Sequence, residues 1–260
     1  MKLEIKNATC SYGYNTIFND ISFAVHSGEV LCLLGPNGSG KTTLLKAILG
    51  LLKLKQGDIY LNGKNINRWA QQDKAKVIGY IPQNHNPLFP YKVIDIVLMG
   101  RTAHLDIFSS PTKTDFEIAL EALFTLNISH LRDRVYTEIS GGERQLVLIA
   151  RALAQQPDIL IMDEPTSNLD FGNQHMVLSS IKGLVKQGLA VIMSSHFPDH
   201  ALLYANKVLI LEKGNKYKFG KPDDILTENC IKNLYGINVK KISNILKNNS
   251  ELKSFVPIPN

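Results

Sequence analysis

Long apolar runs are missing from this sequence. Its 260 residues have a mean hydropathy of −0.04, and the longest apolar segments, such as residues 159–162 and 208–211, have the length of strands. A membrane-spanning helix needs about 20 apolar residues. The first residues alternate apolar and charged side chains, which is not the pattern of a secretory signal. We therefore expect a soluble protein that does not span a membrane by itself.

Cysteine is also scarce, which argues against a disulfide framework. Cys10, Cys32 and Cys230 are odd in number and lack the paired spacing of a metal site. We expect free thiols in a reducing compartment, and hence a cytosolic protein.

The net charge of +6 raises the question of a nucleic-acid partner, and its distribution argues against one. Between residues 207 and 253, ten lysines and no arginine stand against five acidic residues, which accounts for +5 of the +6. A surplus that is spread out, free of arginine and not interleaved with aromatic residues is a poor nucleic-acid groove. A solvated face and a surface near an anionic membrane both remain open for this segment.

Short apolar strands alternate with helical patterns, which is typical of an α/β fold with a largely parallel sheet. The opening of the chain differs, because three segments look like antiparallel strands: residues 3–8, 17–25 and 59–62, the last before an Asn62-Gly63 turn. The remaining expected strands are 30–34, 78–81, 159–162, 190–194 and 207–211, the last followed by a turn at Gly214-Asn215. The expected helices are 41–51, 142–155 and one that ends near residue 186.

Strand patterns are absent from about residue 87 to residue 138. Val93, Val97 and Leu98 form one helical stripe there. A second stripe has the spacing i, i+3, i+4 and i+7, and its members are Phe116, Ala119, Leu120 and Leu123. We expect a helical lobe inserted in the α/β core. The tail after Pro222 has weak helical patterning and no motif.

A glycine-rich segment between a strand and a helix has the spacing of a phosphate-binding loop, G-x-x-x-x-G-K-[ST]. Its residues are Gly35, Pro36, Asn37, Gly38, Ser39, Gly40, Lys41, Thr42 and Thr43. Backbone N–H groups of such a loop surround phosphates at the positive end of the helix. We expect Lys41 to reach the β- and γ-phosphates and the Thr42 hydroxyl to hold Mg²⁺. The segment predicts a nucleoside triphosphate site, the alternative being a helix cap with a surface lysine.

Two acidic residues end an apolar strand farther along the chain. Asp163, at the tip of a parallel strand next to the phosphate loop, would be placed to hold Mg²⁺. Glu164 would then polarise the water that attacks the γ-phosphate, as a general base. A strand that ends in an exposed Asp-Glu turn is common, so this interpretation depends on the phosphate loop that accompanies it.

A second candidate anion site starts a helix. Ser140 is a good N-cap, and Gly141 and Gly142 leave bare N–H groups at the positive helix end, ahead of Glu143. Capping alone does not need two glycines, which cost helix stability. They suit close approach of a second anion, the γ-phosphate of another nucleotide. Head-to-tail pairing of two chains would then close two shared sites.

The ordered set of these motifs closely resembles an ABC-transporter ATP-binding subunit over about residues 1–240. The residues that carry the resemblance are Tyr12, Gly35 to Thr43, Gln83, Ser140 to Glu143, Asp163, Glu164, residues 167–170 and His196. The resemblance implies ATP and Mg²⁺ as cofactors. It also implies that Tyr12 stacks on adenine and that Gln83 contacts Mg²⁺ and the attacking water. Asp170 would communicate across the dimer, and His196 would act as the γ-phosphate switch.

The fold implied by the resemblance is an α/β P-loop NTPase (RecA-like) core with an antiparallel β subdomain and an inserted helical subdomain. Residues 1–86 and 139–220 would form the core with its antiparallel lobe, and residues 87–138 the helical lobe. Residues 221–260 would form a short basic tail.

Taken singly, three of these residues have plainer readings. Tyr12 on a strand edge is more often packing, Gln83 after a strand is usually a polar loop residue, and His196 is ambiguous, although imidazole can donate to phosphate. The chain also departs from the family pattern, because Ile139, Leu146 and Asn168 replace the customary leucine, basic residue and alanine. The first swap conserves volume. The other two lie outside the phosphate shell and put tuning across the dimer in doubt.

Three further segments look like the metal-chelate importer class, which serves iron-siderophores, haem and cobalamin: residues 93–101, 150–155 and 234–237. Within that class the resemblance is closest to a molybdate/tungstate import ATP-binding protein. In such systems a homodimer of ATPase chains lies beneath two copies of a multi-helix permease, on the cytoplasmic face of the inner membrane. A separate binding protein delivers the solute from outside, so the solute itself leaves no trace in this chain.

Rival functions remain open. An exporter ATPase is a near rival, although many exporters are fused to membrane helices. Soluble ABC proteins that act on ribosomes or DNA resemble two cassettes in one chain, or one cassette split by a coiled coil, whereas only about 57 residues separate Gln83 from Ser140 here. A binding module without catalysis is least favoured, because Asp163, Glu164 and His196 are all present.

Overall fold

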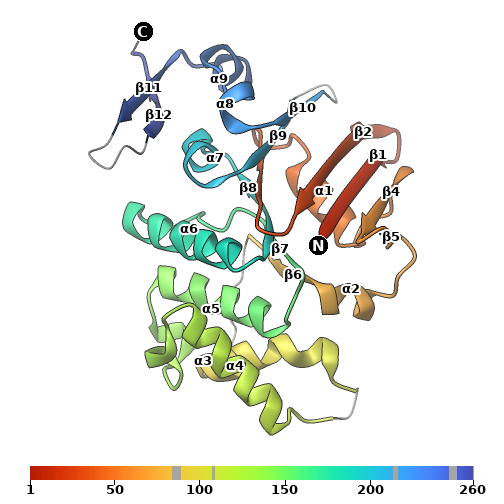
Figure 1. Ribbon diagram of the computed structural model, residues 1–260, viewed down its shortest axis with the longest axis vertical. Helices are drawn as coiled ribbons and strands as arrows, with labels where there is room; N and C mark the ends of the chain where they lie inside the picture. Colours follow the sequence, from red (N-terminus) through yellow and green to blue (C-terminus); the bar gives the residue numbers. More distant parts are fainter. Residues whose placement is uncertain (84–88, 107–108, 213–215, 246–250, 260) are drawn as a thin grey trace. The chain divides into compact units, whose positions relative to one another are not determined.

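The computed structural model describes residues 1–83, 89–106, 109–212, 216–245 and 251–259 (Figure 1). The chain divides into two compact units, one made of Met1–Asn67 and Ala190–Asn260 and the other of Arg68–Leu189. Within the described residues, every helix is too short or too polar to cross a bilayer. The turn expected at Gly214-Asn215 and the first two residues of the expected helical lobe, 87–88, lie outside the described residues.

The first unit opens with an antiparallel sheet of order β2-β1-β4-β5. Its strands are β1 (Lys2–Tyr12), β2 (Asn15–His26), β4 (Gln56–Leu61) and β5 (Lys64–Asn65). Alternate residues of a strand face the same side, and Leu3, Ile5 and Val25 are accordingly buried. Asn62 and Gly63 both have positive φ, as a tight hairpin turn requires. The predicted antiparallel strands and their turn are confirmed.

Parallel strands form the other sheet of the first unit. They are β3 (Val30–Leu34), β8 (Ala190–Ser195) and β9 (Lys207–Leu211), in the order β9-β3-β8, with β10 (Tyr217–Gly220) antiparallel to β9. Every residue of β3 and β8 is buried, as parallel strands usually are. The helices of this unit are α1 (Lys41–Ile48), α7 (Pro198–Tyr204), α8 (Pro222–Ile225) and α9 (Glu228–Tyr235). Helix α7 and strand β10 were not predicted from the sequence, and α1 ends earlier than the expected residue 51.

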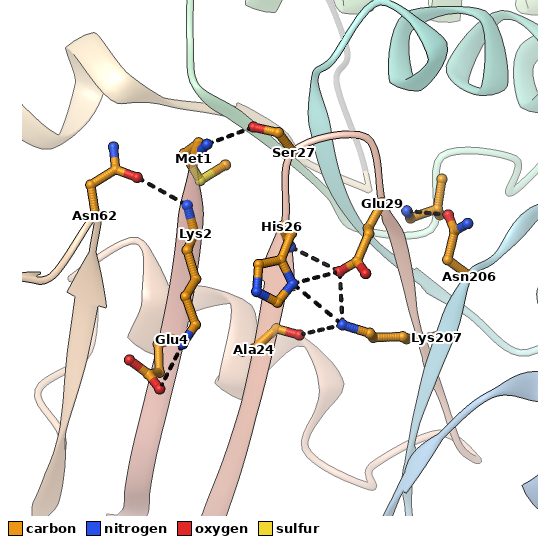
Figure 2. Close-up of polar contacts among 11 residues, drawn as sticks. Met1, Lys2, Glu4, Ala24, His26, Ser27, Glu29, Asn62, Asn206 and Lys207 are labelled. Carbon is orange, nitrogen blue, oxygen red and sulfur yellow. Dashed lines mark hydrogen bonds and ion pairs between the residues drawn. The ribbon is translucent and has the colours of Figure 1, made fainter.

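Hydrogen bonds of Glu29 and Asn206 connect the turn between β2 and β3 to β9 and the residue before it (Figure 2). The Glu29 carboxylate accepts hydrogen bonds from Lys207 Nζ at 2.8 Å and from the backbone N–H of His26 at 2.9 Å. Next to it, Asn206 Oδ1 accepts from the backbone N–H of Val30 at 2.8 Å. Burial of the Glu29 carboxyl raises its pKa, but the bonds from Lys207 and His26 outweigh burial and hold this pKa below its usual value.

The tail differs from the prediction. Weak helical patterning describes α8 and α9, but β11 (Val239–Ile245) and β12 (Glu251–Pro257) then form an antiparallel hairpin. The hairpin is attached by polar contacts, because the Asp199 carboxylate accepts from Ser254 Oγ at 2.8 Å and from the backbone N–H of Phe255 at 2.9 Å. Lys241 and Lys253 both pair with Asp223, at 3.2 and 2.9 Å. Part of the basic surplus therefore meets acidic partners within the tail.

The second unit contains the parallel pair β6 (Ile78–Ile81) and β7 (Ile159–Met162). Its helices are α2 (Gln71–Val77), α3 (Val93–Leu98), α4 (Lys113–Thr125), α5 (Gly141–Ala154) and α6 (Phe171–Lys186). Short 3₁₀ turns are η1 (Met99–His104), η2 (Ser129–Leu131) and η3 (Tyr136–Glu138). The described part of the expected lobe is helical, with one β-bridge between Lys92 and Val135. Its boundaries stay a prediction, since the compact unit starts at residue 68.

The apolar stripe predicted on α4 is half wrong. Ala119 and Leu123 are buried, but Phe116 and Leu120 are 43% and 36% exposed. The first turn of α4 instead directs Asp115 inward, where its Oδ1 accepts from Arg101 Nε at 2.8 Å. Consecutive helix residues point about 100° apart, so an inward Asp115 leaves Phe116 on the outside.

Candidate functional site

The phosphate loop lies in the first unit, between β3 and α1. Gly40, the residue before α1, has a φ of 99°, in the left-handed region that favours glycine. Lys41 is only 5% exposed, and its Nζ donates to the carbonyl oxygens of Gly35 at 2.8 Å and Pro36 at 3.2 Å. The ammonium is held against the loop, which excludes the alternative of a surface lysine.

A buried hydroxyl in the loop fits a phosphate. Ser39 Oγ is buried and, among the described residues, has no hydrogen-bond partner. Leaving such a group unsatisfied costs about 1–3 kcal/mol, and a phosphate oxygen would supply the acceptor. Thr42, the expected Mg²⁺ ligand, is exposed, and Thr43 is half-buried in the same turn of α1.

Tyr12 and His196 are the other predicted residues of the first unit. Tyr12 ends β1 and is 50% exposed, and its stacking on adenine stays a prediction. His196 follows β8, and its ring centroid lies 4.2 Å from that of Phe197. Phe197 in turn lies 5.0 Å from the ring of His200, and His200 Nδ1 lies 3.1 Å from Ser195 Oγ. His196 therefore lies at the end of a buried strand, with its ring against that of Phe197.

The second unit brings Gln83 and Glu164 together. Gln83 Nε2 donates to Glu164 Oε2 at 2.7 Å, across 81 residues of sequence. Glu164 has a φ of 49°, which is uncommon outside glycine and occurs at strained functional positions. The preceding Asp163 is buried, and its backbone N–H donates to the Ile81 carbonyl at 2.9 Å. The carboxylate predicted as general base therefore points at the amide predicted to contact the same water.

Ser140 starts α5 in a reciprocal cap. Its Oγ accepts from the backbone N–H of Glu143 at 3.3 Å, and its own N–H donates to Glu143 Oε2 at 2.8 Å. Hydrogen bonds from the Ser140 side chain and backbone hold the pKa of Glu143 below its usual value. The predicted N-cap is confirmed, and Ser140 itself is exposed.

The two glycines of this helix start differ in what surrounds them. A Cβ at Gly142 would overlap Asn173 Oδ1 and lie 2.6 Å from Asn173 Cγ, so a larger residue there would have to displace the Asn173 side chain. A Cβ at Gly141 would meet, of the residues described, Leu169 alone, with Cδ2 at 3.4 Å. The anion predicted at this helix start stays a prediction for Gly141, whereas Gly142 also has a packing reason that was not predicted from the sequence.

Asp170 is the N-cap of α6. Its Oδ1 accepts from the backbone N–H of Asn173 and its Oδ2 from Asn173 Nδ2, both at 2.8 Å. Asn173 was not among the site residues predicted from the sequence. The spacing of three residues from the N-cap is the signal that could have found it.

The structure explains the family departures. Ile139 and Leu146 are 6% and 3% exposed, so apolar side chains suit both positions. Asn168 has a φ of 61°, a conformation that asparagine tolerates better than alanine.

The segments that resemble the metal-chelate class make contacts within the chain. Arg101 Nη1 donates to the Ala154 carbonyl at 2.8 Å and to Gln156 Oε1 at 3.0 Å. Gly236, with a φ of 74°, closes α9. Among the described residues, these segments contain no group of side chains that could hold a metal ion.

Comparison with known proteins gives consistent matches. The family model described as ABC transporter matches residues 18–167. An uncharacterized ABC transporter ATP-binding protein of Haemophilus influenzae is 43% identical over 251 residues, covering 96% of this chain and 95% of the relative. The molybdate import ATP-binding protein MolC of Haemophilus influenzae is 40% identical over 222 residues, covering 85% of this chain and 82% of the relative.

Among solved structures, the chain is similar to one described as a metal-chelate type ABC transporter in an inward-facing conformation. The TM-score is 0.88 at 37% identity, and the match covers 99% of this chain and 97% of that one. This similarity confirms the predicted fold, an α/β P-loop NTPase core with an antiparallel β subdomain and a helical subdomain.

Proposed function

The chain belongs to the ABC transporter family, as an ATP-binding protein that couples ATP hydrolysis to transport, and from this membership we propose that it energises import of a metal-containing solute. The solute class is a molybdate or tungstate oxyanion or a metal chelate such as iron-siderophore, haem or cobalamin. Similarity to a molybdate import protein and to a metal-chelate type transporter supports this assignment.

The proposed assembly is a homodimer of this chain with two copies of a multi-helix permease. It would lie at the cytoplasmic face of the inner membrane and receive solute from an extracytoplasmic binding protein. ATP closes the dimer, closure moves the permease, and hydrolysis resets it.

ATP binding is assigned to the first unit. Tyr12 stacks on adenine, Ser39 donates its unpartnered hydroxyl to a phosphate oxygen, and Lys41 turns its ammonium to the β- and γ-phosphates. The observation that supports this step is that one phosphate loop contains both a buried Lys41 ammonium and a buried Ser39 hydroxyl without a hydrogen-bond partner among the described residues.

Hydrolysis is assigned to Glu164 as general base. Its carboxylate takes the proton of the attacking water, while the Gln83 amide holds that carboxylate in place through the 2.7 Å hydrogen bond. The hydroxyl of Thr42, the carboxylate of Asp163 and the amide of Gln83 offer the hard oxygen donors that Mg²⁺ prefers. Bound Mg²⁺ would offset charge on the β- and γ-phosphates. His196 donates to the γ-phosphate.

The second anion site is assigned to the partner's nucleotide. Gly141 and Gly142 present backbone N–H groups at the start of α5, and Ser140 offers its hydroxyl. The Ser140 N–H is donated to Glu143, which holds this helix start together. Asp170 communicates between the paired chains.

Substitution of Glu164 tests the catalytic assignment. We expect Glu164→Gln to keep ATP affinity within about twofold and to lower turnover by about 10²–10⁴-fold. Glu138→Gln, at an exposed acid of η3, is the matched control and should keep turnover. Unchanged turnover in Glu164→Gln would remove the proposed role.

Co-purification tests the transport assignment. The tagged chain, extracted from native membranes in mild detergent, should bring with it a multi-helix permease in equal amount. Recovery with ribosomes or DNA alone would mean that the cassette drives something other than transport.

A further inference from the structure

Two parts of the second unit are assigned above to contacts across the dimer: the Ser140–Gly142 start of α5, and Asp170 at the start of α6. They are about 30 residues apart in sequence. Helices α5 and α6 lie side by side (Figure 1) and are in contact. One side chain, that of Asn173 in the first turn of α6, touches both helix starts.

The two ends of the Asn173 amide have different neighbours. Nδ2 donates to Asp170 Oδ2 at 2.8 Å, which holds the carboxylate that caps α6. Oδ1 lies against Gly142, in the space that a Cβ would otherwise fill. The side chain is half-buried. It is therefore enclosed between a carboxylate on one side and the bare backbone of α5 on the other.

The contacts suit asparagine in both shape and chemistry. Aspartate has the same shape but offers no donor to Asp170, and it would place two carboxylates together. Alanine would leave a gap beside Gly142 and no bond to Oδ2. The backbone N–H of Asn173 still donates to Asp170 Oδ1 whatever the side chain, so α6 keeps its cap in each variant.

We propose that Asn173 is a positioning residue that fixes the Ser140–Gly142 start of α5 relative to Asp170. The two helix starts then contact the partner chain's nucleotide as one rigid surface. ATP-driven closure of the dimer depends on their position relative to each other. This inference rests on the proposed function, because it needs both parts to act across a dimer. It places Asn173 outside the nucleotide contacts themselves.

ATP-driven dimerisation tests whether closure depends on the relative position of the two helix starts. In the full chain carrying Glu164→Gln, light scattering with Mg-ATP gives the ATP concentration at half-dimerisation. We expect Asn173→Ala to raise that concentration at least tenfold and Asn173→Asp to raise it further. ATP affinity of the monomer should stay within twofold, since the phosphate loop belongs to the first unit. With Glu164 restored, the chain can hydrolyse ATP. If turnover requires the dimer, its rate should depend sigmoidally on the ATP concentration. Both Asn173 variants should weaken this sigmoidal dependence, while their affinity for ATP as monomers stays the same.

Ser180→Ala is the matched control. Ser180 also lies on α6, but within the part of the chain that the structure describes its Oγ donates to the Met176 carbonyl of the same helix, at 2.9 Å, and not to α5. This variant should dimerise as the parent does. Because Asn173→Asp keeps the volume of the side chain, it reports on the bond to Asp170 even if the gap in Asn173→Ala disturbs packing.

Gly141→Asp separates failure of this inference from failure of the proposed function. If Gly141→Asp blocks dimerisation while both Asn173 variants match Ser180→Ala, the positioning role is wrong and the shared site stands. If Gly141→Asp dimerises normally, the shared site is wrong and the inference falls with it.

Discussion

At the scale of single residues, the polar side chains of the three motifs form hydrogen bonds within their own units. Lys41, Ser140 and Glu164 lie in the local settings that their motifs predict. The contact between Gly142 and Asn173 could not be predicted from the sequence. The glycine pattern indicated an anion, but the contact with a side chain 31 residues away supplies a packing reason. Contacts of that kind arise from helix packing and leave no local signal.

The two adjacent glycines make a matched pair for measuring that contact. Gly142→Ala forces a Cβ onto Asn173 and should lower the free energy of unfolding by about 1–3 kcal/mol. Gly141→Ala places its Cβ at ordinary contact distance from Leu169 and should change the unfolding free energy little. Urea unfolding of both variants without nucleotide decides the matter. Equal losses would mean that Gly142 is not packed against Asn173 in solution.

A buried ion pair in the helical region makes stability depend on pH. The hydrogen bond from Arg101, followed by those from Thr112, lowers the pKa of Asp115 to about 2. A lowered pKa means that the carboxylate stabilises the folded state above its ordinary pKa of about 4. That contribution is lost as the pH falls from about 4 towards about 2.

Asp115→Asn tests this dependence. The variant should be less stable at pH 7, and the stability it loses between pH 4 and pH 2 should be smaller than in the parent. Trp69 is the single tryptophan and lies in the second unit with Asp115, so its fluorescence follows the unfolding of that unit. The account would be contradicted by parallel pH profiles for parent and variant.

At the scale of helices and strands, hydrophobic periodicity predicted the elements that are buried on a whole face. The strands β3, β7 and β8 and the helix α5 follow from it. It failed for α4, where Asp115 rather than Phe116 faces inward to Arg101. It also failed for the β11–β12 hairpin, which buries Val239 and Phe255 but is attached as well by the polar contacts of Asp199 and Asp223.

The hairpin should detach when Asp199 is removed. An isolated two-stranded hairpin is marginally stable in water, and hydrogen bonds to a charged group contribute about 1.5–3 kcal/mol each. Asp199→Ala should therefore make the C-terminal segment on the order of tenfold more susceptible to limited proteolysis. Asp224→Ala, at an exposed acid of α8, is the control. Equal cleavage of the two variants would mean that Asp199 does not attach the hairpin.

At the scale of the whole molecule, the fold class followed from the sequence because strands and helices alternate around a recognisable phosphate loop. The roles that need a second chain or a permease cannot be read from the contacts of a single chain. Ser140, Gly141 and Asp170 are exposed or half-exposed in the single chain, and their proposed contacts lie on other molecules. The identity of the solute does not follow from this chain, because no part of it is assigned to bind the solute.

Uptake by the co-purified complex in sealed vesicles, with radiolabelled molybdate set against an iron chelate, tests the central claim most directly. The account predicts that one of these solutes accumulates with ATP, and that Glu164→Gln abolishes accumulation while the complex stays intact. Accumulation that proceeds equally with Glu164→Gln would contradict it, and so would ATP-driven movement of solute in the opposite direction.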